Sequence, residues 1–138
     1  MREALKEAMT AFGKDEVPVG CVIVSGSGII ARAHNLTETL NDPTAHAEMQ
    51  AITAAAQVVG GKYLNDCTLY VTLEPCPMCA GALFWAQIGK IVYGAADPKR
   101  GFSLSGASLL HPKTIVESGV LAGESARLLQ RFFRKKRS

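Results

Sequence analysis

The sequence has no hydrophobic run of the length that a membrane-spanning helix requires. Such a helix needs about 20 consecutive apolar residues, and charged or polar residues interrupt every apolar stretch of this chain well before that length. A basic segment followed by an apolar one, which is typical of a secretory leader, is also missing ahead of the first expected helix. We therefore expect a cytoplasmic protein that makes no membrane contact.

Cysteine is scarce, with four residues in the whole chain. Disulfides are rare in a reducing compartment, so two structural disulfides are not expected. Cys21 and Cys67 lie within apolar, strand-like segments and are expected to be buried free thiols. Cys76 and Cys79 form a Cys-x-x-Cys pair, which in a cytosolic enzyme favours metal binding or redox chemistry.

Internal repeats, linkers and low-complexity segments are missing as well. A chain of 138 residues, with 48% apolar and 20% charged residues, has an ordinary globular composition and can bury a sizeable core. The sequence therefore predicts a single domain over residues 1–138.

Acidic residues are missing from the C-terminal end. Residues 131–138 contain five bases and no acid, and the rest of the chain holds 10 basic and 12 acidic side chains, so the net charge of +3 arises at this end. A basic cluster suits a polyanion such as nucleic acid. A solvated tail that only aids solubility is the alternative interpretation.

Helical and strand-like patterns alternate along the chain. Apolar residues at helical spacing predict helices over residues 2–13, from about 44 to 59, from 75 to about 87, and from about 122 into the basic end. Apolar runs predict strands over residues 19–24, 29–33, 67–73, 90–93 and 114–117, the first two forming a hairpin covered on both faces. A further helical turn is expected at residues 107–110. Because the two later crossovers predict parallel pairing, we expect an α/β fold, with one mixed sheet sandwiched between helices.

The spacing of four residues indicates a metal centre. His46 and Glu48 form a His-x-Glu pair, and Cys76 and Cys79 follow Pro75 further along the chain. One imidazole and two thiolates supply three zinc ligands, the number found in catalytic sites that keep a position for water, whereas structural sites normally have four. The pattern predicts a catalytic zinc. Structural zinc and a thioredoxin-like redox pair are the alternatives, but a redox pair gives no role to His46 or Glu48.

The four residues are expected at the N-termini of two helices. Residues i and i+2 of a regular helix point about 200° apart, so His46 and Glu48 converge only if the site lies beyond a helix N-terminus, toward which side chains tilt. A helix N-terminus also stabilises the thiolates of Cys76 and Cys79. We therefore predict that two helix N-termini meet at the zinc.

The predicted chemistry is hydrolytic deamination. Zinc lowers the pKa of bound water to about 7, and Glu48 is not needed as a ligand. Glu48 is therefore predicted to take the water proton and to return it to a ring nitrogen and then to a leaving amine. Attack on an amidine-like carbon, followed by loss of ammonia, completes the reaction.

At this point the chain resembles the cytidine deaminase-like superfamily and, within it, the bacterial tRNA-specific adenosine deaminases. The similar segments include Glu16-Val-Pro-Val-Gly20, Asp42-Pro-Thr-Ala-His-Ala-Glu48, Leu73-Glu-Pro-Cys-Pro-Met-Cys79 and Phe132-Phe-Arg134. The resemblance implies a five-stranded α/β/α sandwich, that is, a three-layer cytidine deaminase-like fold, a homodimer and one Zn2+ per chain. The implied substrate is a tRNA anticodon stem-loop whose wobble adenosine becomes inosine. His46, Cys76 and Cys79 carry over as zinc ligands, and Glu48 as the residue that moves protons.

The resemblance also implies substrate contacts. Asn35 and Val19 fall where the family holds the purine and lines the base pocket, and Asp97 falls where it contacts the sugar and backbone of the nucleotide. From the residues alone, turn formation would explain Asn35 and Asp97, and core packing would explain Val19.

The run Phe132-Phe133-Arg134 has two interpretations. Either the rings face the core while Arg134 and the following bases meet phosphate, or the aromatic pair stacks on an unstacked base. A core-facing ring is expected for Phe133. The orientation of Phe132 is not predicted, and Phe132 is a substrate-binding candidate together with Arg134.

Residues 101–113 differ from the usual family segment and are shorter, which affects the substrate assignment more than the zinc assignment. A deaminase of a free nucleobase or nucleoside, such as guanine or cytosine, is therefore the alternative function, since it shares the zinc signature but has no need of a basic end. A third hypothesis is a non-enzymatic RNA-binding module with structural zinc, whose function would survive Glu48→Ala.

Overall fold

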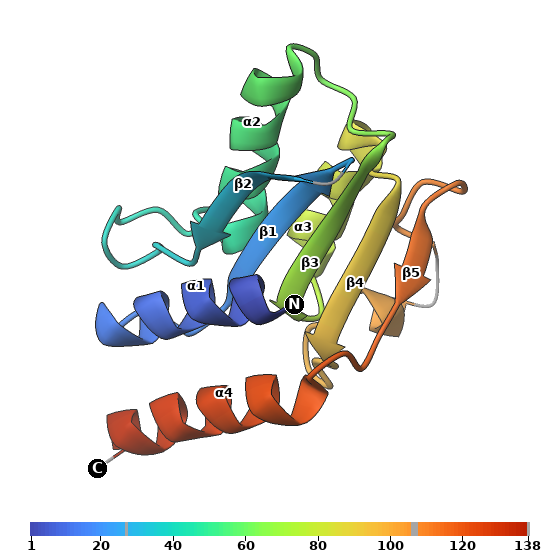
Figure 1. The fold of residues 1–138 in the computed structure, drawn as a ribbon. Coiled ribbons are helices and arrows are strands. Elements are labelled where there is room, and N and C mark those ends of the chain that lie inside the picture. The colour runs from blue at the N-terminus through green and yellow to red at the C-terminus, as the bar shows by residue number, and fades with distance from the viewer. Residues whose placement is uncertain (27, 106–107, 138) are drawn as a thin grey trace.

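Strands and helices alternate as the sequence periodicity predicts, and Figure 1 shows them in the computed structural model, which describes residues 1–26, 28–105 and 108–137. The elements in chain order are α1 (Arg2–Gly13), β1 (Gly20–Ser25), β2 (Gly28–His34), α2 (Ala47–Val59), β3 (Cys67–Leu73), α3 (Pro77–Ala86), β4 (Lys90–Ala95), the 3-10 helix η1 (Phe102–Ser105), β5 (Ile115–Glu117) and α4 (Ala122–Arg137). Within these described residues, no helix has the length and apolar character needed to cross a membrane.

The five strands form one mixed sheet in the order β2-β1-β3-β4-β5. β1 pairs antiparallel with both β2 and β3, whereas β4 is parallel to β3 and β5. The two parallel pairs follow the two later crossovers, as predicted. The carboxyl ends of β3 and β4 therefore lie at the same edge of the sheet as the start of β1.

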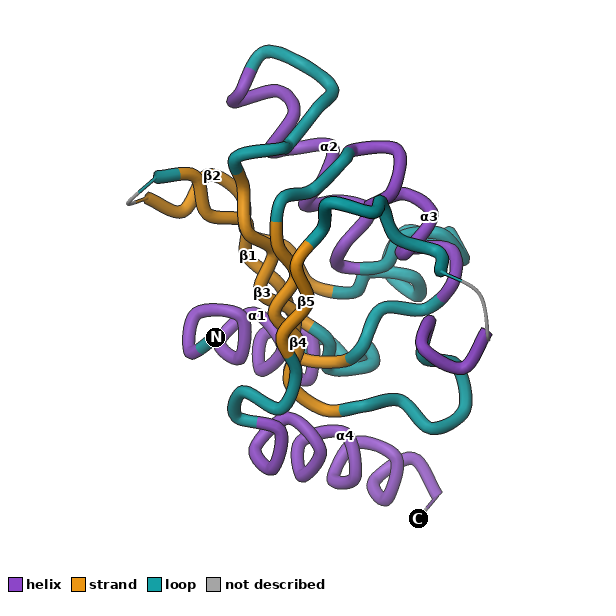
Figure 2. The backbone as a smooth tube through the Cα atoms, turned by 90° about the vertical axis from the view of Figure 1, so that its right-hand side faces the viewer, coloured by secondary structure: helices purple, strands orange, loops and turns teal. Residues whose placement is uncertain are grey.

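Helices cover both faces of the sheet, so the predicted three-layer α/β/α sandwich is confirmed (Figures 1 and 2). On one face, Cys21 and Ile23 of β1 join the main core together with residues of α2 and α3. On the other face lie α1 and α4. Gly20 shows how closely α1 approaches, because a Cβ atom there would lie 2.3 Å from the Ala4 carbonyl oxygen. Cys21 and Cys67 are buried free thiols, as expected.

Some local predictions are wrong. Strand β2 is an edge strand with exposed positions at Gly28, Ile29 and Arg32, so the hairpin is not covered on both faces. The 3-10 helix occurs at residues 102–105; of the turn expected at residues 107–110, residue 107 lies outside the described residues and residues 108–110 are not helical. Helix α2 begins at Ala47, later than predicted.

The late start of α2 has a local cause. Asp42 accepts hydrogen bonds at its Oδ1 atom from the Thr44 N–H group at 2.8 Å and from the Thr44 hydroxyl at 2.7 Å. These two residues, which looked like helix caps, therefore stabilise a turn of their own. His46 becomes the N-cap residue of α2, ahead of the regular helix.

Candidate functional site

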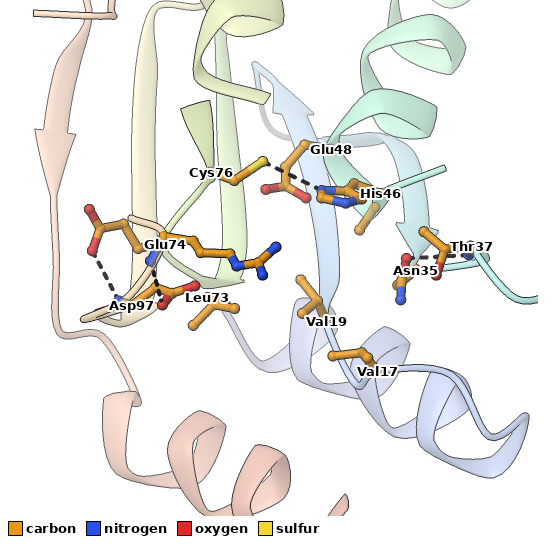
Figure 3. Close-up of a pocket in the computed structure, with 12 residues that line it drawn as sticks. Val17, Val19, Asn35, Thr37, His46, Glu48, Leu73, Glu74, Cys76 and Asp97 are labelled. Atoms are coloured by element: carbon orange, nitrogen blue, oxygen red, sulfur yellow. Dashed lines mark hydrogen bonds between the residues drawn. The ribbon is translucent and has the colours of Figure 1, made fainter. Parts of the chain in front are cut away.

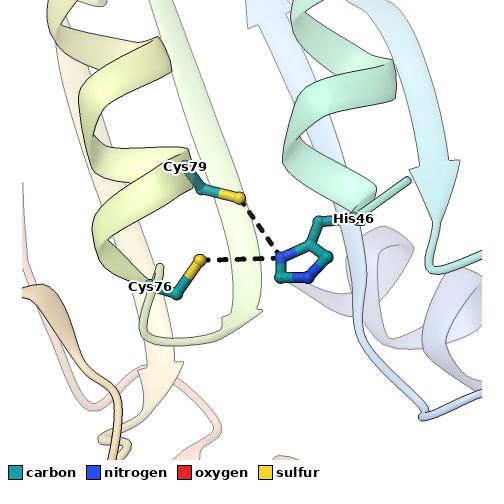
Figure 4. Close-up of side chains that lie close together, drawn as sticks. All are labelled: His46, Cys76 and Cys79. Carbon is teal, nitrogen blue, oxygen red and sulfur yellow. Dashed lines mark hydrogen bonds between the residues drawn. The ribbon is translucent and has the colours of Figure 1, made fainter. Parts of the chain in front are cut away.

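Three potential ligand side chains meet at the N-termini of α2 and α3 (Figure 4). His46 is the N-cap residue of α2, Cys76 is the N-cap residue of α3, and Cys79 lies in the first turn of α3. The His46 Nδ1 atom lies 3.6 Å from the Cys76 Sγ atom and 3.5 Å from the Cys79 Sγ atom. One ligand atom from each residue lies within 4.8 Å of the other two, so the group could hold a metal ion. The predicted meeting of two helix N-termini is confirmed.

The backbone at the two caps explains how these side chains converge. Both N-cap residues are extended, with φ −68° and ψ 156° at His46 and φ −74° and ψ 170° at Cys76, and neither makes a side-chain capping hydrogen bond. Their side chains can therefore turn toward each other instead of folding back on the helix. Pro77 occupies the first turn of α3, where a missing N–H group is harmless. The sequence assigned this role to Pro75, which instead precedes the helix.

The two thiols and the imidazole are electrostatically coupled. A hydrogen bond from the Cys79 thiol, helped by His46, lowers the pKa of Cys76 to about 4 against the opposing effect of burial. The same hydrogen bond, together with burial, raises the pKa of Cys79, and the hydrogen bond with Cys76 raises the pKa of His46. A thiolate is thus stabilised at Cys76, and the thiolate is the form that binds metal. Two thiols and one imidazole fit zinc, and three ligands leave a fourth position for water.

Glu48 lies next to this group without belonging to it. It sits in the first turn of α2 and is 3% exposed. It lines the same cavity as His46 and Cys76 (Figure 3). Burial raises the pKa of its carboxyl to about 7. A carboxyl with a pKa near neutrality can both accept and release a proton at one pH, as general acid–base catalysis requires.

The cavity has a volume of about 210 Å³ and lies where β3 and β4 end. Crevices at the carboxyl ends of parallel strands are the usual ligand sites of open α/β sheets. Part of the wall is apolar and is formed by Val17, Val19 and Leu73. The polar or charged side chains that line it include Asn35, Thr37, Asp97 and Arg100. Such a wall is typical of a site for a small, mostly apolar ligand group.

Three of the five residues expected at the substrate, Val19, Asn35 and Asp97, line this cavity, and two of them also form turns. Asn35 is 6% exposed, and its Oδ1 atom accepts a long hydrogen bond from the Thr37 N–H group at 3.4 Å. The Asn35 N–H group donates to the Val19 carbonyl at 3.0 Å, which links two neighbouring segments of the wall. Turn formation and cavity lining are therefore compatible at Asn35.

Asp97 likewise serves a turn at the cavity rim. Its Oδ1 atom accepts hydrogen bonds from the backbone N–H groups of Lys99 and Arg100, each at 3.0 Å. These bonds fix the direction of the chain directly after β4. Asp97 therefore orders the segment that presents the Arg100 side chain to the cavity.

Glu74 anchors the loop over residues 97–103 and is a functional residue that sequence reasoning missed. It is 3% exposed. Its Oε1 atom accepts from the Asp97 N–H group at 3.0 Å, and its Oε2 atom accepts from the N–H and hydroxyl groups of Ser103 at 3.0 and 2.7 Å. A Cβ atom on Gly101 would lie 2.3 Å from the carboxyl carbon, so the loop passes too close for any larger residue.

Glu16 anchors the opposite wall in the same way and was also missed. It is 0% exposed and accepts hydrogen bonds from the Glu38 N–H group at 3.0 Å and from the N–H and hydroxyl groups of Thr39, each at 2.6 Å. The available signal was an acid followed by proline within one or two residues, as in Glu16-Val-Pro and Glu74-Pro. A carboxylate that is buried in such a segment requires hydrogen bonds.

In the aromatic pair of α4, the buried ring is Phe132, which the sequence left open, and the expectation for Phe133 is wrong. Phe132 is 4% exposed and packs edge-on against Phe12 with ring centroids 6.0 Å apart. A base cannot stack on a ring that is buried in this way, so Phe132 is not a substrate contact. Phe133, which was expected to face the core, is 45% exposed and lines a groove together with Arg134.

Comparisons with known proteins agree with this geometry. Residues 1–95, which include His46, Glu48, Cys76 and Cys79, match the family described as cytidine and deoxycytidylate deaminase zinc-binding region. The tRNA-specific adenosine deaminase of Bacillus subtilis (strain 168) is 49% identical over 142 residues, covering 99% of this chain and 88% of that protein.

Two solved structures are similar as well. One, from a study of A-to-I editing by tRNA:A34 deaminases at the wobble position of transfer RNA, has a TM-score of 0.87 and 44% identity, covering 93% of this chain and 96% of that one. The guanine deaminase from Bacillus subtilis has a TM-score of 0.66 and 43% identity, covering 69% of this chain and 61% of that one.

Proposed function

Because the chain belongs to the cytidine and deoxycytidylate deaminase family and, within it, to the tRNA-specific adenosine deaminases, we propose that it converts the wobble adenosine of a tRNA anticodon to inosine. The observation that carries this proposal is the 49% identity with a tRNA-specific adenosine deaminase over 99% of the chain, since it extends through every segment around the site. We assign the activity to residues 1–138 as a single deaminase domain.

His46, Cys76 and Cys79 would hold one zinc ion, through Nδ1 of His46 and the two Sγ atoms. When bound, zinc supplies Lewis-acid activation of a water at neutral pH. The helix N-termini at His46 and Cys76 stabilise the thiolate ligands, since both helix dipoles point their positive ends toward the site.

Glu48 moves the protons in this proposal. Its carboxylate accepts the proton of the attacking water and delivers it to a ring nitrogen of adenine. It then transfers the second water proton to the amino group at C6, which leaves as ammonia while a C=O bond replaces the C–N bond. The raised pKa of about 7 suits both transfers, because it makes the carboxyl neither too weak a base nor too weak an acid near neutral pH.

The remaining cavity residues position the substrate. Val19 contributes to the apolar wall that would face the purine, and the Asn35 carboxamide supplies hydrogen bonds to it. Asp97 lies at the rim, where it would meet the sugar of the flipped-out nucleotide. Arg134 is exposed in the adjoining groove and would contact phosphate. These roles require that the adenosine leave the stacked anticodon loop, as base-modifying enzymes generally require.

A deaminase of free guanine is the competing function. It is favoured by the 43% identity with the guanine deaminase structure, although that similarity covers only 69% of this chain. A free base carries no phosphate and makes no use of basic residues beside the cavity. The cations next to the site therefore support a polynucleotide substrate.

We also propose that the protein is located in the cytoplasm, where tRNA is found and where free thiols stay reduced.

We further propose that the chain forms a homodimer. Apolar side chains are exposed on and beside α2 and α3, and Trp85 of α3 is 77% exposed. The others are Val58, Val59, Tyr63 and Met78. Tryptophan is enriched in the centres of protein interfaces.

The test is an ammonia-release assay of the zinc-loaded protein. One arm receives an anticodon stem-loop RNA with a wobble adenosine, and the other receives free guanine, adenine, cytosine and their nucleosides. We expect ammonia and inosine from the RNA alone. Turnover of free guanine without turnover of the RNA would contradict the proposal and establish the competing function.

Glu48→Gln is the matched control in this assay. It removes the proton carrier but keeps the size of the side chain, so zinc content should stay at one per chain while the rate falls by about 100-fold or more. A variant that keeps both its zinc and its wild-type rate would contradict the role of Glu48.

A further inference from the structure

A second and larger groove adjoins the catalytic cavity. It has a volume of about 900 Å³ and runs between α4 and the segment that follows β4. The groove and the cavity share four lining residues, so the two spaces are continuous there. These residues are Val17, Leu73, Asp97 and Arg100. A ligand whose reacting group occupies the cavity can therefore extend into the groove along α4.

The groove is strongly basic. Four cations line it, namely Lys99, Arg100, Arg134 and Arg137, and Asp97 is the single acidic residue among its described lining. The Asp97 Oδ1 atom is already engaged by two backbone N–H groups. The positive charge of the groove is thus not neutralised by its own walls.

The two groove cations that belong to α4, Arg134 and Arg137, differ from Arg131 and Lys136 of the same helix. Lys136 pairs with Asp15 of the segment after α1, and Arg131 lies 5.4 Å from the centre of the Phe12 ring. By contrast, within residues 1–26, 28–105 and 108–137, the side chains of Arg134 and Arg137 have no ion pair, hydrogen bond or ring contact. The basic end is therefore not a uniform solvated tail. One side of α4 is engaged with α1, and the other side presents unpaired charge to the groove.

Arg100 holds the decisive position, because no other lysine or arginine among the described residues lines the catalytic cavity. Its side chain is exposed and has no ion pair or hydrogen bond within the part of the chain that the structure describes. Its backbone is fixed, since its N–H group donates to Asp97, and Glu74 holds the loop on either side through Asp97 and Ser103. A free guanidinium on a fixed backbone at the junction of a base cavity and a basic groove is well placed for an anion.

We infer that Arg100 binds a backbone phosphate next to the target nucleotide and so selects a polynucleotide over a free base. The inference rests on the proposed function and adds to it a residue that determines substrate class. Arginine suits this task because its planar guanidinium can donate two parallel hydrogen bonds to phosphate. The strand then continues along the groove, where Arg134 and Arg137 meet further phosphates and Phe133 offers an exposed ring for an unstacked base.

The number of cations along the groove favours a polynucleotide over a mononucleotide with a single 5′-phosphate. One phosphate would satisfy Arg100 and leave Arg134 and Arg137 without partners. A strand places phosphates at regular intervals and can engage all of these cations in turn.

Salt-dependent binding tests the inference without relying on catalysis. The zinc-loaded protein is titrated against a fluorescent anticodon stem-loop RNA at several salt concentrations, and the slope of log K against log[salt] is measured. Each phosphate contact to a single strand contributes about 0.7 to this slope. We expect Arg100→Ala to reduce the slope by about 0.7 and Arg100→Lys to retain it with weaker binding.

Arg127→Ala is the matched control. Arg127 of α4 is, like Arg100, an exposed arginine without an ion pair among the described residues, but it lines a different surface beside Arg2 and Glu124. Its slope should equal that of the wild type. An Arg100→Ala slope equal to that of the wild type would overturn the inference.

A competition arm separates the two sources of phosphate. If Arg100→Ala removes a preference for adenosine 5′-monophosphate over adenosine while leaving the RNA slope unchanged, the contact is to a mononucleotide and the inference is overturned. If the RNA slope falls as expected but the wild type forms no inosine, the proposed reaction fails while the Arg100 contact stands.

Discussion

Glu16 and Glu48 are both buried carboxyls, yet their pKa values move in opposite directions. Burial raises both, but at Glu16 the hydrogen bonds from Thr39 and from the Glu38 N–H group outweigh burial and lower the pKa. Glu48 has weaker opposing contributions, and its pKa rises to about 7. The number of donors around a buried carboxyl thus decides whether it is a fixed anion or a proton carrier.

The first prediction concerns Glu16 and pH. Its folded-state pKa lies below the ordinary value of 4.5, so the carboxylate stabilises the fold above that value, and this stabilisation is lost as the pH falls through the folded-state pKa. Glu16→Gln should lower the free energy of unfolding by about 2 kcal/mol at pH 7, because the amide presents N–H groups to donors. Urea unfolding at a series of pH values should show this difference shrinking toward zero in acid.

Glu38→Gln is the control for that experiment, since Glu38 is exposed and loses the same charge without disturbing the buried acceptor. It should change stability little at any pH. A Glu16→Gln deficit that stays constant into acid would mean that packing, not the carboxylate charge, supports this wall.

Single residues differ in how far the sequence predicts them. His46 and the two site cysteines were predicted from spacing because metal binding demands specific donor atoms. The orientation of Phe132 and Phe133 could not be predicted, since neighbouring helix residues point about 100° apart and only the packing of Phe12 decides which ring is buried.

At the scale of elements, the loop over residues 97–103 depends on a close approach to Glu74. Gly101→Ala would force a Cβ atom to 2.3 Å from the Glu74 carboxyl carbon. We expect the loop to shift at a cost of about 1–3 kcal/mol in stability, with a higher KM for the stem-loop RNA and an unchanged zinc content. Unfolding curves, kinetics and metal analysis measure the three quantities.

Gly13→Ala serves as the comparison, because a Cβ atom there meets nothing within 4 Å. That variant should match the wild type in KM. If Gly101→Ala also matches the wild type in both stability and KM, the loop is less tightly held than the contact with Glu74 implies.

Element boundaries were predicted less well than element types. The parallel pairs followed from the crossovers, whereas the start of α2 was misplaced because Asp42 and Thr44 bond to each other. Turn residues and cap residues are the same amino acids, so sequence pattern alone does not separate them. The exposure of β2 depends on its place at the sheet edge, which its own apolar residues do not reveal.

At the scale of the whole molecule, the apolar side chains exposed on α2 and α3 lead to a prediction about assembly. Trp85→Glu should raise the dimer dissociation constant by about 30-fold or more, as expected when a central interface residue is lost. Analytical ultracentrifugation over a concentration series measures it. Met9→Glu is the matched control, since Met9 is 61% exposed but lies on α1, on the opposite side of the sheet.

The wild type and Met9→Glu should have the same weight-average molar mass. Trp85→Glu should have a lower weight-average molar mass at the same concentration. A wild-type chain that remains monomeric throughout the series would show that the exposed Trp85 face does not mediate self-association.

The anchoring of the loop to Glu74 also bears on how this enzyme can change over generations. Two backbone amides and one hydroxyl make the three hydrogen bonds to Glu74. Backbone amides are present whatever the side chain, so only Gly101 and Ser103 are constrained by the anchor through their own identity. Substitutions other than proline at positions 99 and 100, and any that position 98 accommodates, therefore leave the hydrogen bonds of the loop in place and do not touch the ligand cluster. Substrate choice can therefore change in this chain without a change in the reaction chemistry. A library of variants confined to these three positions should contain proteins with new substrate specificity and an unchanged ligand cluster.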